Sequence, residues 1–132
     1  MAKKIVAADV APDGTIYVLG KVGASVSVTA LKHGKKVATM PAVTGAFRVN
    51  RVGASTITID KDGRTMRDGV MIDALERYVF DLVTVHGVSW APGTDGRCAR
   101  LGAGDDAWKP AGWSVKQGEI ESLCGGKRGP IV

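Results

Sequence analysis

The sequence predicts a mainly β protein, an antiparallel sandwich or small barrel built from two similar hairpins and extended by a Gly/Trp-rich loop arm. A short segment, Lys21 to Ser25, recurs as Arg51 to Ser55, 30 positions later. The stretch from Ser25 to Leu31 alternates apolar and polar residues, which is typical of a strand with one buried face. The 18 glycines supply many tight turns.

The apolar residues around this repeat recur with a different spacing, 31 positions. Successive side chains of a strand point to opposite faces, so a one-residue slip would turn a whole apolar set outward. We interpret the two spacings as two hairpins whose apolar face is fixed by packing while the turn varies. All members of the set are then expected to face one core: Ile16, Val18, Val26, Val28, Phe47, Val49, Ile57 and Ile59.

Strands are predicted in order along residues 14–60, without any helical periodicity. Gly23, His33-Gly34 and the Asp60 to Gly63 segment are turn signals, and Pro41 excludes a central strand beyond it. Short loops of this kind join antiparallel neighbours. The expected strands cover residues 15–19, 25–31, 35–40, 46–50 and 56–60.

Residues 64–86 give a weaker pattern. Residues 70–78 fit a short helix, with Asp68 as N-cap, and fit a strand equally well. Residues 78–86 read as a strand with apolar side chains on both faces, which indicates burial on both sides. Asp81 interrupts that strand, so it needs either a partner or an edge position.

The chain divides in composition after residue 86. We expect residues 1–86 to form the antiparallel β domain and residues 87–132 to form an irregular C-terminal arm with short strands. The arm holds all three tryptophans, both cysteines and ten of the 18 glycines. It is expected to contain a short strand at residues 113–116, one helical turn at 118–123 and a flexible basic tail from Gly125 to Pro130.

Composition indicates a soluble globular protein of one domain, or one domain with an appended arm. The chain has 132 residues and a net charge of +5, and no apolar stretch approaches the roughly 20 residues of a membrane helix. Its N-terminus lacks the apolar core of a signal peptide, so synthesis in the cytoplasm is expected. Cys98 and Cys124 match no zinc spacing and are expected as thiols in a reducing compartment, with a late disulfide left open.

No residue pattern supports catalysis, a cofactor or a metal. Counting from Asp60, position 12 of a calcium loop is Met71 and not the bidentate Glu that such a loop requires. Asp105 and Asp106 fit an exposed acidic turn better than an acid–base pair. His86 and Cys98 lack a third, orienting residue, so a cysteine nucleophile is not expected. We therefore expect a non-enzymatic protein.

The tryptophans are the best candidates for partner binding, because Trp side chains are frequent interface anchors. The alternative is that they form the core of their own segment. If they bind, the arm docks against another protein chain and at least one Trp is buried in the complex alone. Basic side chains would face an acidic partner. The candidate partner-binding residues are Trp90, Trp108, Trp113, Lys32, Lys35, Lys36, Arg97 and Arg100.

Residues 14–60 resemble the small immunoglobulin-like modules of tailed-phage virion proteins and bacterial surface repeats. The resemblance is carried by Gly14 to Val18, Val22 to Val28, Gly45 to Val49 and Ser55 to Ile59. It implies an immunoglobulin-like form of the predicted sandwich and a structural role in the virion as a capsid cement, neck or tail component.

Under this resemblance the partners are other virion proteins, with the chain present as a homo-oligomer or in many copies. The protein would be made in the host cytoplasm and act in the virion, without a membrane. One rival is a small basic nucleic-acid-binding β-module that uses the turn from Lys32 to Lys36 and the basic tail. A small enzyme is the weaker rival, and it would have to assemble a pocket from His86, Cys98 or the Asp105/Asp106 pair.

Overall fold

The computed structural model describes residues 4–75, 79, 81–93, 97–114, 124–126 and 129–131, and within these ranges the chain is all β. Every strand pair is antiparallel, and neighbouring strands in each sheet are consecutive in sequence. The predicted antiparallel, mainly β class is therefore confirmed.

The first sheet is a four-stranded meander near the N-terminus. Its edge strand β4 ends at Pro41, as expected for a residue that has no backbone N–H to donate. The strands, in spatial order, are β1 (Lys4–Val10), β2 (Ile16–Val22), β3 (Ser25–Lys32) and β4 (Lys35–Pro41).

The second sheet repeats this arrangement with shorter strands. Its last two strands are joined by a tight turn at Asp68-Gly69, where both residues have positive φ. The strands are β5 (Arg48–Val52), β6 (Ser55–Ile59), β7 (Thr65–Arg67) and β8 (Val70–Ile72).

The third sheet and a final strand pair complete the described chain. The sheet has the order β12-β11-β10-β9, so it too is a meander, and the pair β13-β14 follows it. The bounds are β9 (Val83–Val85), β10 (Val88–Pro92), β11 (Arg97–Gly102), β12 (Lys109–Ser114), β13 (Cys124–Gly126) and β14 (Gly129–Ile131).

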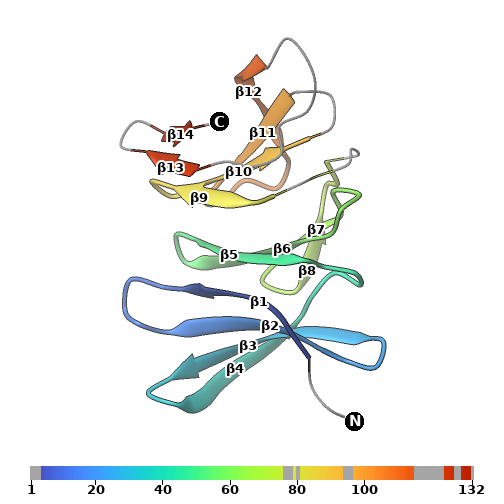
Figure 1. Ribbon diagram of the computed structural model, residues 1–132, viewed down its shortest axis with the longest axis vertical. Helices are drawn as coiled ribbons and strands as arrows, with labels where there is room; N and C mark the ends of the chain where they lie inside the picture. Colours follow the sequence, from blue (N-terminus) through green and yellow to red (C-terminus); the bar gives the residue numbers. More distant parts are fainter. Residues whose placement is uncertain are drawn as a thin grey trace.

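The three sheets are stacked, with the second sheet between the first and the third (Figure 1). One apolar cluster, which includes Leu19, Val28 and Val49, joins the first sheet to the second. Another cluster, which includes Ile59, Leu82 and Leu101, joins the second sheet to the third. The first strands of successive sheets meet, since β1 contacts β5 and β5 contacts β9.

The sequence repeat corresponds to two equal hairpin turns. Val22 pairs with Ser25 and Val52 pairs with Ser55, so each turn has the same two-residue Gly-Ala loop. The φ angles of Gly23 and Gly53 are 60° and 61°, in the left-handed region that glycine adopts without steric cost. The predicted turn at His33-Gly34 is likewise confirmed, because Lys32 pairs with Lys35 across it.

The prediction that eight apolar residues face one core is wrong. Val28 and Val49 belong to the cluster between the first two sheets, whereas Ile57 and Ile59 belong to the cluster between the second and third. Ile16 is 41% exposed, on the face opposite the buried Leu19. The reason is that the middle sheet is covered on both faces. Its apolar side chains are therefore buried on either face, and they belong to two different clusters.

The predicted immunoglobulin-like two-layer arrangement and the loop arm also need correction. An immunoglobulin-like sandwich distributes its strands over two sheets through Greek-key connections, whereas each sheet here consists of consecutive strands. Much of the expected arm is regular structure, because β10, β11 and β12 complete the third sheet. The boundary expected between residues 86 and 87 falls in the turn that joins β9 to β10.

Residues 70–78, which fitted a helix and a strand equally well, are strand only in part, and the tail expected to be flexible contains a strand pair. Within the span 70–78, Val70–Ile72 forms β8, residues 73–75 are irregular and residues 76–78 lie outside the described ranges. The tail expected to be flexible contributes β13 and β14, because Cys124 to Gly126 pairs with Gly129 to Ile131. The helical turn expected at 118–123 and the end of the strand expected at 113–116 lie outside the described residues.

Candidate functional site

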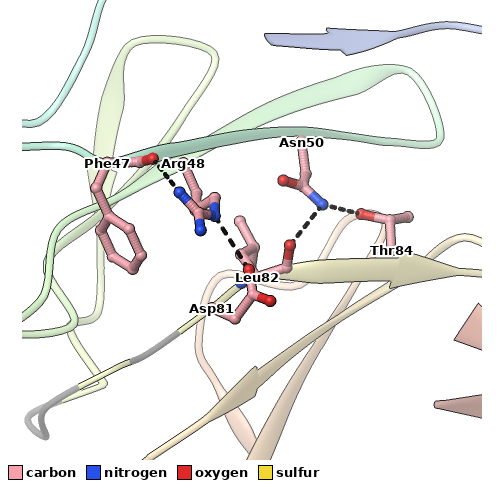
Figure 2. A network of polar contacts seen from close by, with 6 residues as sticks. All are labelled: Phe47, Arg48, Asn50, Asp81, Leu82 and Thr84. Carbon is pink, nitrogen blue, oxygen red and sulfur yellow. Dashed lines mark hydrogen bonds and ion pairs between the residues drawn. The ribbon is translucent and has the colours of Figure 1, made fainter. Parts of the chain in front are cut away.

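The first strand of the middle sheet, β5, carries a row of polar residues, Arg48, Asn50 and Arg51, which we call the polar seam. On the side of the third sheet, Arg48 donates from Nε to Oδ1 of Asp81 at 3.0 Å and from a terminal nitrogen to the carbonyl oxygen of Phe47 at 3.0 Å (Figure 2). Its guanidinium carbon lies 5.0 Å from the centroid of the Phe47 ring, within cation–π range. Asp81, expected to need a partner or an edge position, thus has a partner in Arg48.

Asn50 extends the seam by one more position on the same face of β5. Its side-chain nitrogen donates to the carbonyl oxygen of Leu82 at 3.1 Å and to the hydroxyl of Thr84 at 2.9 Å (Figure 2). The Thr84 hydroxyl also forms a 3.0 Å hydrogen bond with the hydroxyl of Ser89. These bonds fix the position of β9 against β5.

The opposite face of β5 makes polar contacts with the first sheet. The backbone nitrogen of Arg51 donates to Oδ2 of Asp9 at 2.7 Å, and its guanidinium donates to the hydroxyl of Thr56 at 2.9 Å. That guanidinium also stacks on Tyr17, with 4.4 Å from its central carbon to the ring centroid. The charged head is therefore held between two sheets by an aromatic face and a hydroxyl.

A pocket of about 380 Å³ opens at the end of the seam. Its lining includes Asp9, Arg51 and Thr84, one residue from each sheet. The hydroxyl of Thr84 is already engaged by Asn50 and Ser89.

The predicted partner-binding residues fall into two groups that the fold keeps apart. Lys32, Lys35 and Lys36 lie on the β3–β4 hairpin of the first sheet, where Lys32 forms an exposed ion pair with Asp13 at 3.7 Å. The other group lies on the third sheet or beside it, with the middle sheet between the two groups. Its members are Trp90 on β10, Arg97 and Arg100 on β11, Trp108 just before β12, and Trp113 on β12.

The tryptophans differ in their surroundings. The indole nitrogen of Trp108 donates to the hydroxyl of buried Thr65 at 2.9 Å, and its ring packs against the cluster between the second and third sheets. Trp108 therefore has the core role that was the alternative to partner binding. Trp90 is partly buried and Arg100 is exposed, whereas the side chains of Trp113 and Arg97 lie outside the described part of the chain.

The acidic turns have structural roles. Buried Asp60 accepts from the backbone nitrogens of Asp62 and Arg64, both at 2.9 Å, which accounts for the predicted turn. Asp105 accepts from the backbone nitrogen of Gly102 at 2.9 Å, and this bond, followed by the charge of Lys109, lowers the pKa of the carboxyl group. The described residues contain no group of three or more His, Cys, Asp or Glu side chains suited to a metal ion.

Sequence reasoning missed the seam, although one signal was present. Arg48, Asn50 and Arg51 place three polar side chains in a five-residue strand. A strand that carries such residues between two covered faces must pair them, because unpaired polar groups are costly to bury. Nothing in the sequence, however, indicated that Asp9 and Thr84 would reach this strand from both sides.

Comparison with known proteins informs the fold alone. No protein-family model matches the sequence, and no curated protein matches it. The chain is similar to a solved protein of unknown function from Bacteroides caccae, with a TM-score of 0.63, 12% identity and coverage of 92% of this chain. It spans 52% of that protein, about half its length.

A second similar structure is a computed design. The chain is similar to the computationally designed Ika4 protein, with a TM-score of 0.61 and 10% identity over 92% of this chain and 78% of the other. The stacked all-β fold thus occurs in both natural and designed proteins at very low sequence identity.

Within the described ranges the chain has no helix long and apolar enough to cross a membrane.

Proposed function

We propose that this chain is a non-enzymatic structural protein that acts through protein–protein contacts, as a virion component of a tailed phage in a capsid cement, neck or tail position. The observation that carries the proposal is the outer face of the first sheet. The outer face is here the part of this side formed by β1 and β2, where the apolar side chains of Ile5, Val10, Ile16 and Val22 are exposed. Exposed apolar side chains that gather on one face of a sheet are typical of interaction sites.

Strand register places these four side chains on one side of the sheet. Val10 pairs directly with Ile16, and Ile5 pairs with Gly20, the neighbour of the inward-facing Leu19. Ile16 and Val22 are each three residues from Leu19, so alternation puts them on the face opposite to it. Val10 is 60% exposed and Ile5 is 68% exposed, which leaves most of their surface available to a partner.

The virion assignment has a second support in the sequence. The amino-acid sequences of the strands and turns in residues 14–60 resemble those of virion modules. The outer face does not depend on the immunoglobulin-like topology. The exposed Lys35 and Lys36 on the β3–β4 hairpin add positive charge beside this face. Such charge would speed encounter with an acidic capsid or tail surface more than it would tighten the final complex.

The test compares particles assembled with the wild-type chain, with V10K and with no chain. We expect the wild-type chain to co-purify with particles in many copies and to raise their thermal or osmotic stability. V10K places a charge on the outer face, at the end of β1, and should abolish co-purification. V70K is the matched control, because Val70 is 66% exposed on the edge strand of a different sheet. Particles that are equally stable without the chain would contradict the proposal.

A nucleic-acid-binding module is the second candidate, supported by the exposed lysines of the β3–β4 hairpin. Binding through lysines would weaken steeply with salt, by about 0.9 log units per log unit of salt for each phosphate contacted. Titration of labelled duplex DNA with wild type and with a K35E/K36E double variant would separate the two candidates. Submicromolar binding at physiological salt that the double variant loses would favour this second function.

A further inference from the structure

We propose that the pocket at the end of the polar seam is a binding site for a small zwitterion, an α-amino acid, held between the carboxylate of Asp9 and the guanidinium of Arg51. The site goes beyond the proposed function, because its ligand is a small molecule and not a protein partner. The pocket has a volume of about 380 Å³, at the lower end of the range of small-molecule sites.

The pocket is formed by equivalent parts of the three sheets. Asp9, Arg51 and Thr84 are the second-to-last residues of β1, β5 and β9, and each is followed by a valine. Because β1 contacts β5 and β5 contacts β9, these three strand ends converge on one cavity. Each sheet thus supplies one polar side chain: a carboxylate, a guanidinium and a hydroxyl. The other lining residues belong to these strands or to the turns that follow them: Val10, Pro12, Gly53 and Gly87.

The carboxylate of Asp9 is held in place by backbone groups. Its Oδ1 accepts from the backbone nitrogen of Val10 at 2.9 Å, and its Oδ2 accepts from the backbone nitrogen of Arg51 at 2.7 Å. Each carboxylate oxygen has a further lone pair, so both oxygens can also accept from a ligand. A ligand ammonium group, which donates N–H bonds and carries the opposite charge, suits this end of the pocket.

The guanidinium of Arg51 is also fixed in position and has unused donors. It stacks on the ring of Tyr17 and donates from Nη1 to the hydroxyl of Thr56 at 2.9 Å. A guanidinium has five N–H groups in a planar fork, and among the described residues the buried Nε of Arg51 has no acceptor. Carboxylates match the geometry of such a fork, so this end of the pocket favours a ligand carboxylate.

The two opposite charges line one cavity without neutralising each other. Within the described part of the chain, neither Asp9 nor Arg51 takes part in an ion pair. The groups that hold them are uncharged: backbone N–H groups, an aromatic ring and a hydroxyl. A neutral polyol would leave both charges unmatched, and a simple anion or cation would leave one of them unmatched. A zwitterion matches both charges, which is why we assign an amino acid to the site.

The rest of the lining indicates the size of the ligand. Val10 and Pro12 are apolar, and a Cβ added at Gly87 would have open space around it. The hydroxyl of Thr84 is oriented by its bond to Asn50, so it is a fixed third polar contact. A compact ligand with at most a small aliphatic side chain therefore fits this pocket best.

The first experiment titrates the isotope-labelled wild-type chain with glycine, L-alanine and L-valine and follows the backbone amides by NMR. We expect saturable shifts of the amides that surround the pocket, with a dissociation constant of about 1 mM or lower for at least one of the three. Acetate and methylammonium each carry one of the two ligand charges, and glycerol serves as the neutral polyol. All three should bind roughly tenfold more weakly or worse, because each leaves at least one protein charge unmatched.

Variants test the two charged ends of the site. D9N removes the negative charge but keeps an oxygen that can accept from the backbone of Arg51, and R51K keeps the positive charge but loses the planar fork. Each should weaken amino-acid binding by about tenfold or more. D62N and R64K are the matched controls and should leave the affinity unchanged, because Asp62 and Arg64 are exposed between β6 and β7 and do not line the pocket.

Any of four results would overturn the proposal. These are no saturable shift with any of the three amino acids, binding no tighter than that of acetate or methylammonium, glycerol binding as tight as the best amino acid, and unchanged affinity in both D9N and R51K. The comparison of amino acids with single-charge ligands uses the wild-type chain alone, so it decides the question even if a variant does not fold.

The experiment is independent of the test of the outer face. Val10 borders both the pocket and the outer face, so it is left unchanged here. Amino-acid binding by a chain that does not join particles would remove the virion role and keep the site. Particle binding by a chain that takes up no amino acid would do the reverse.

Discussion

At the scale of single residues, two hairpin glycines, Gly53 and Gly34, both have positive φ but have different surroundings. A Cβ added to Gly53 would lie 3.0 Å from the Cβ of Ala103, in the turn between β11 and β12. The hairpin of the middle sheet therefore approaches the third sheet closely at this point. Gly34, in the β3–β4 turn, also has positive φ but has open space where its Cβ would be.

The first prediction uses that contrast. Both G53A and G34A place alanine at positive φ, which costs about 1–2 kcal/mol. G53A also forces the two turns apart, so we expect it to destabilise by a further 1–3 kcal/mol, roughly. Urea unfolding of both variants measures the difference, and equal losses would show that the contact with Ala103 yields without cost.

The second prediction concerns the carboxyl group of Asp105. The backbone N–H of Gly102 and, after it, the charge of Lys109 lower the pKa of this group in the folded state. A lowered folded pKa means that the group stabilises the fold above its unfolded pKa, and that this contribution is lost as pH falls through the folded pKa.

Carboxyl-detected NMR titration should therefore place the midpoint of Asp105 below the ordinary aspartate value. K109M should move the midpoint upward but leave it lowered, because the hydrogen bond from Gly102 remains. A midpoint that returns fully to the ordinary value in K109M would assign the whole shift to the lysine.

At the scale of strands and turns, the sequence predicted what is encoded locally. The strands near residues 16–22, 25–32 and 35–41 were found because their alternation and glycine turns lie close together in the chain. The face that each strand buries was not found, because it depends on which sheet lies opposite. The middle sheet packs against another sheet on each face, so the alternation of apolar and polar residues in its strands does not show which face is buried.

The third prediction tests burial in the middle sheet. Ile59 has no exposed surface, so I59A should cost about 2–5 kcal/mol through lost contacts and a cavity. The matched substitution V70A removes an exposed side chain in the same sheet and should change stability by less than about 0.5 kcal/mol. Similar losses in the two variants would place Ile59 outside a packed core.

At the scale of the whole molecule, the C-terminal third was the hardest part to predict. Its glycines and tryptophans suggested a loop arm, yet Ala91, Cys98 and Leu101 are buried in a sheet. The signals of tight turns and of loops are the same residues, so composition did not separate them. The polar seam was invisible for a related reason, since Asp9 and Thr84 reach Arg51 and Asn50 from strands distant in sequence.

The fourth prediction tests this part of the fold in the isolated chain. Amides of β10 and β11, including those of Ala91 and Leu101, should be protected from hydrogen exchange nearly as well as those of β3 and β6. The exposed turn at Gly104 should exchange fast and serves as the internal reference. Rapid exchange throughout residues 88–102 would mean that this sheet forms when a partner is present, as the loop-arm interpretation requires.

The order of the strands also bears on how the chain is made. Each sheet uses one uninterrupted stretch of sequence, so its pairings close short loops with little entropic cost. As the chain leaves the ribosome, the first sheet can therefore pair before the second has been translated. The middle sheet buries one face when it docks on the first and the other when the third arrives, so stability should build up layer by layer in the direction of synthesis.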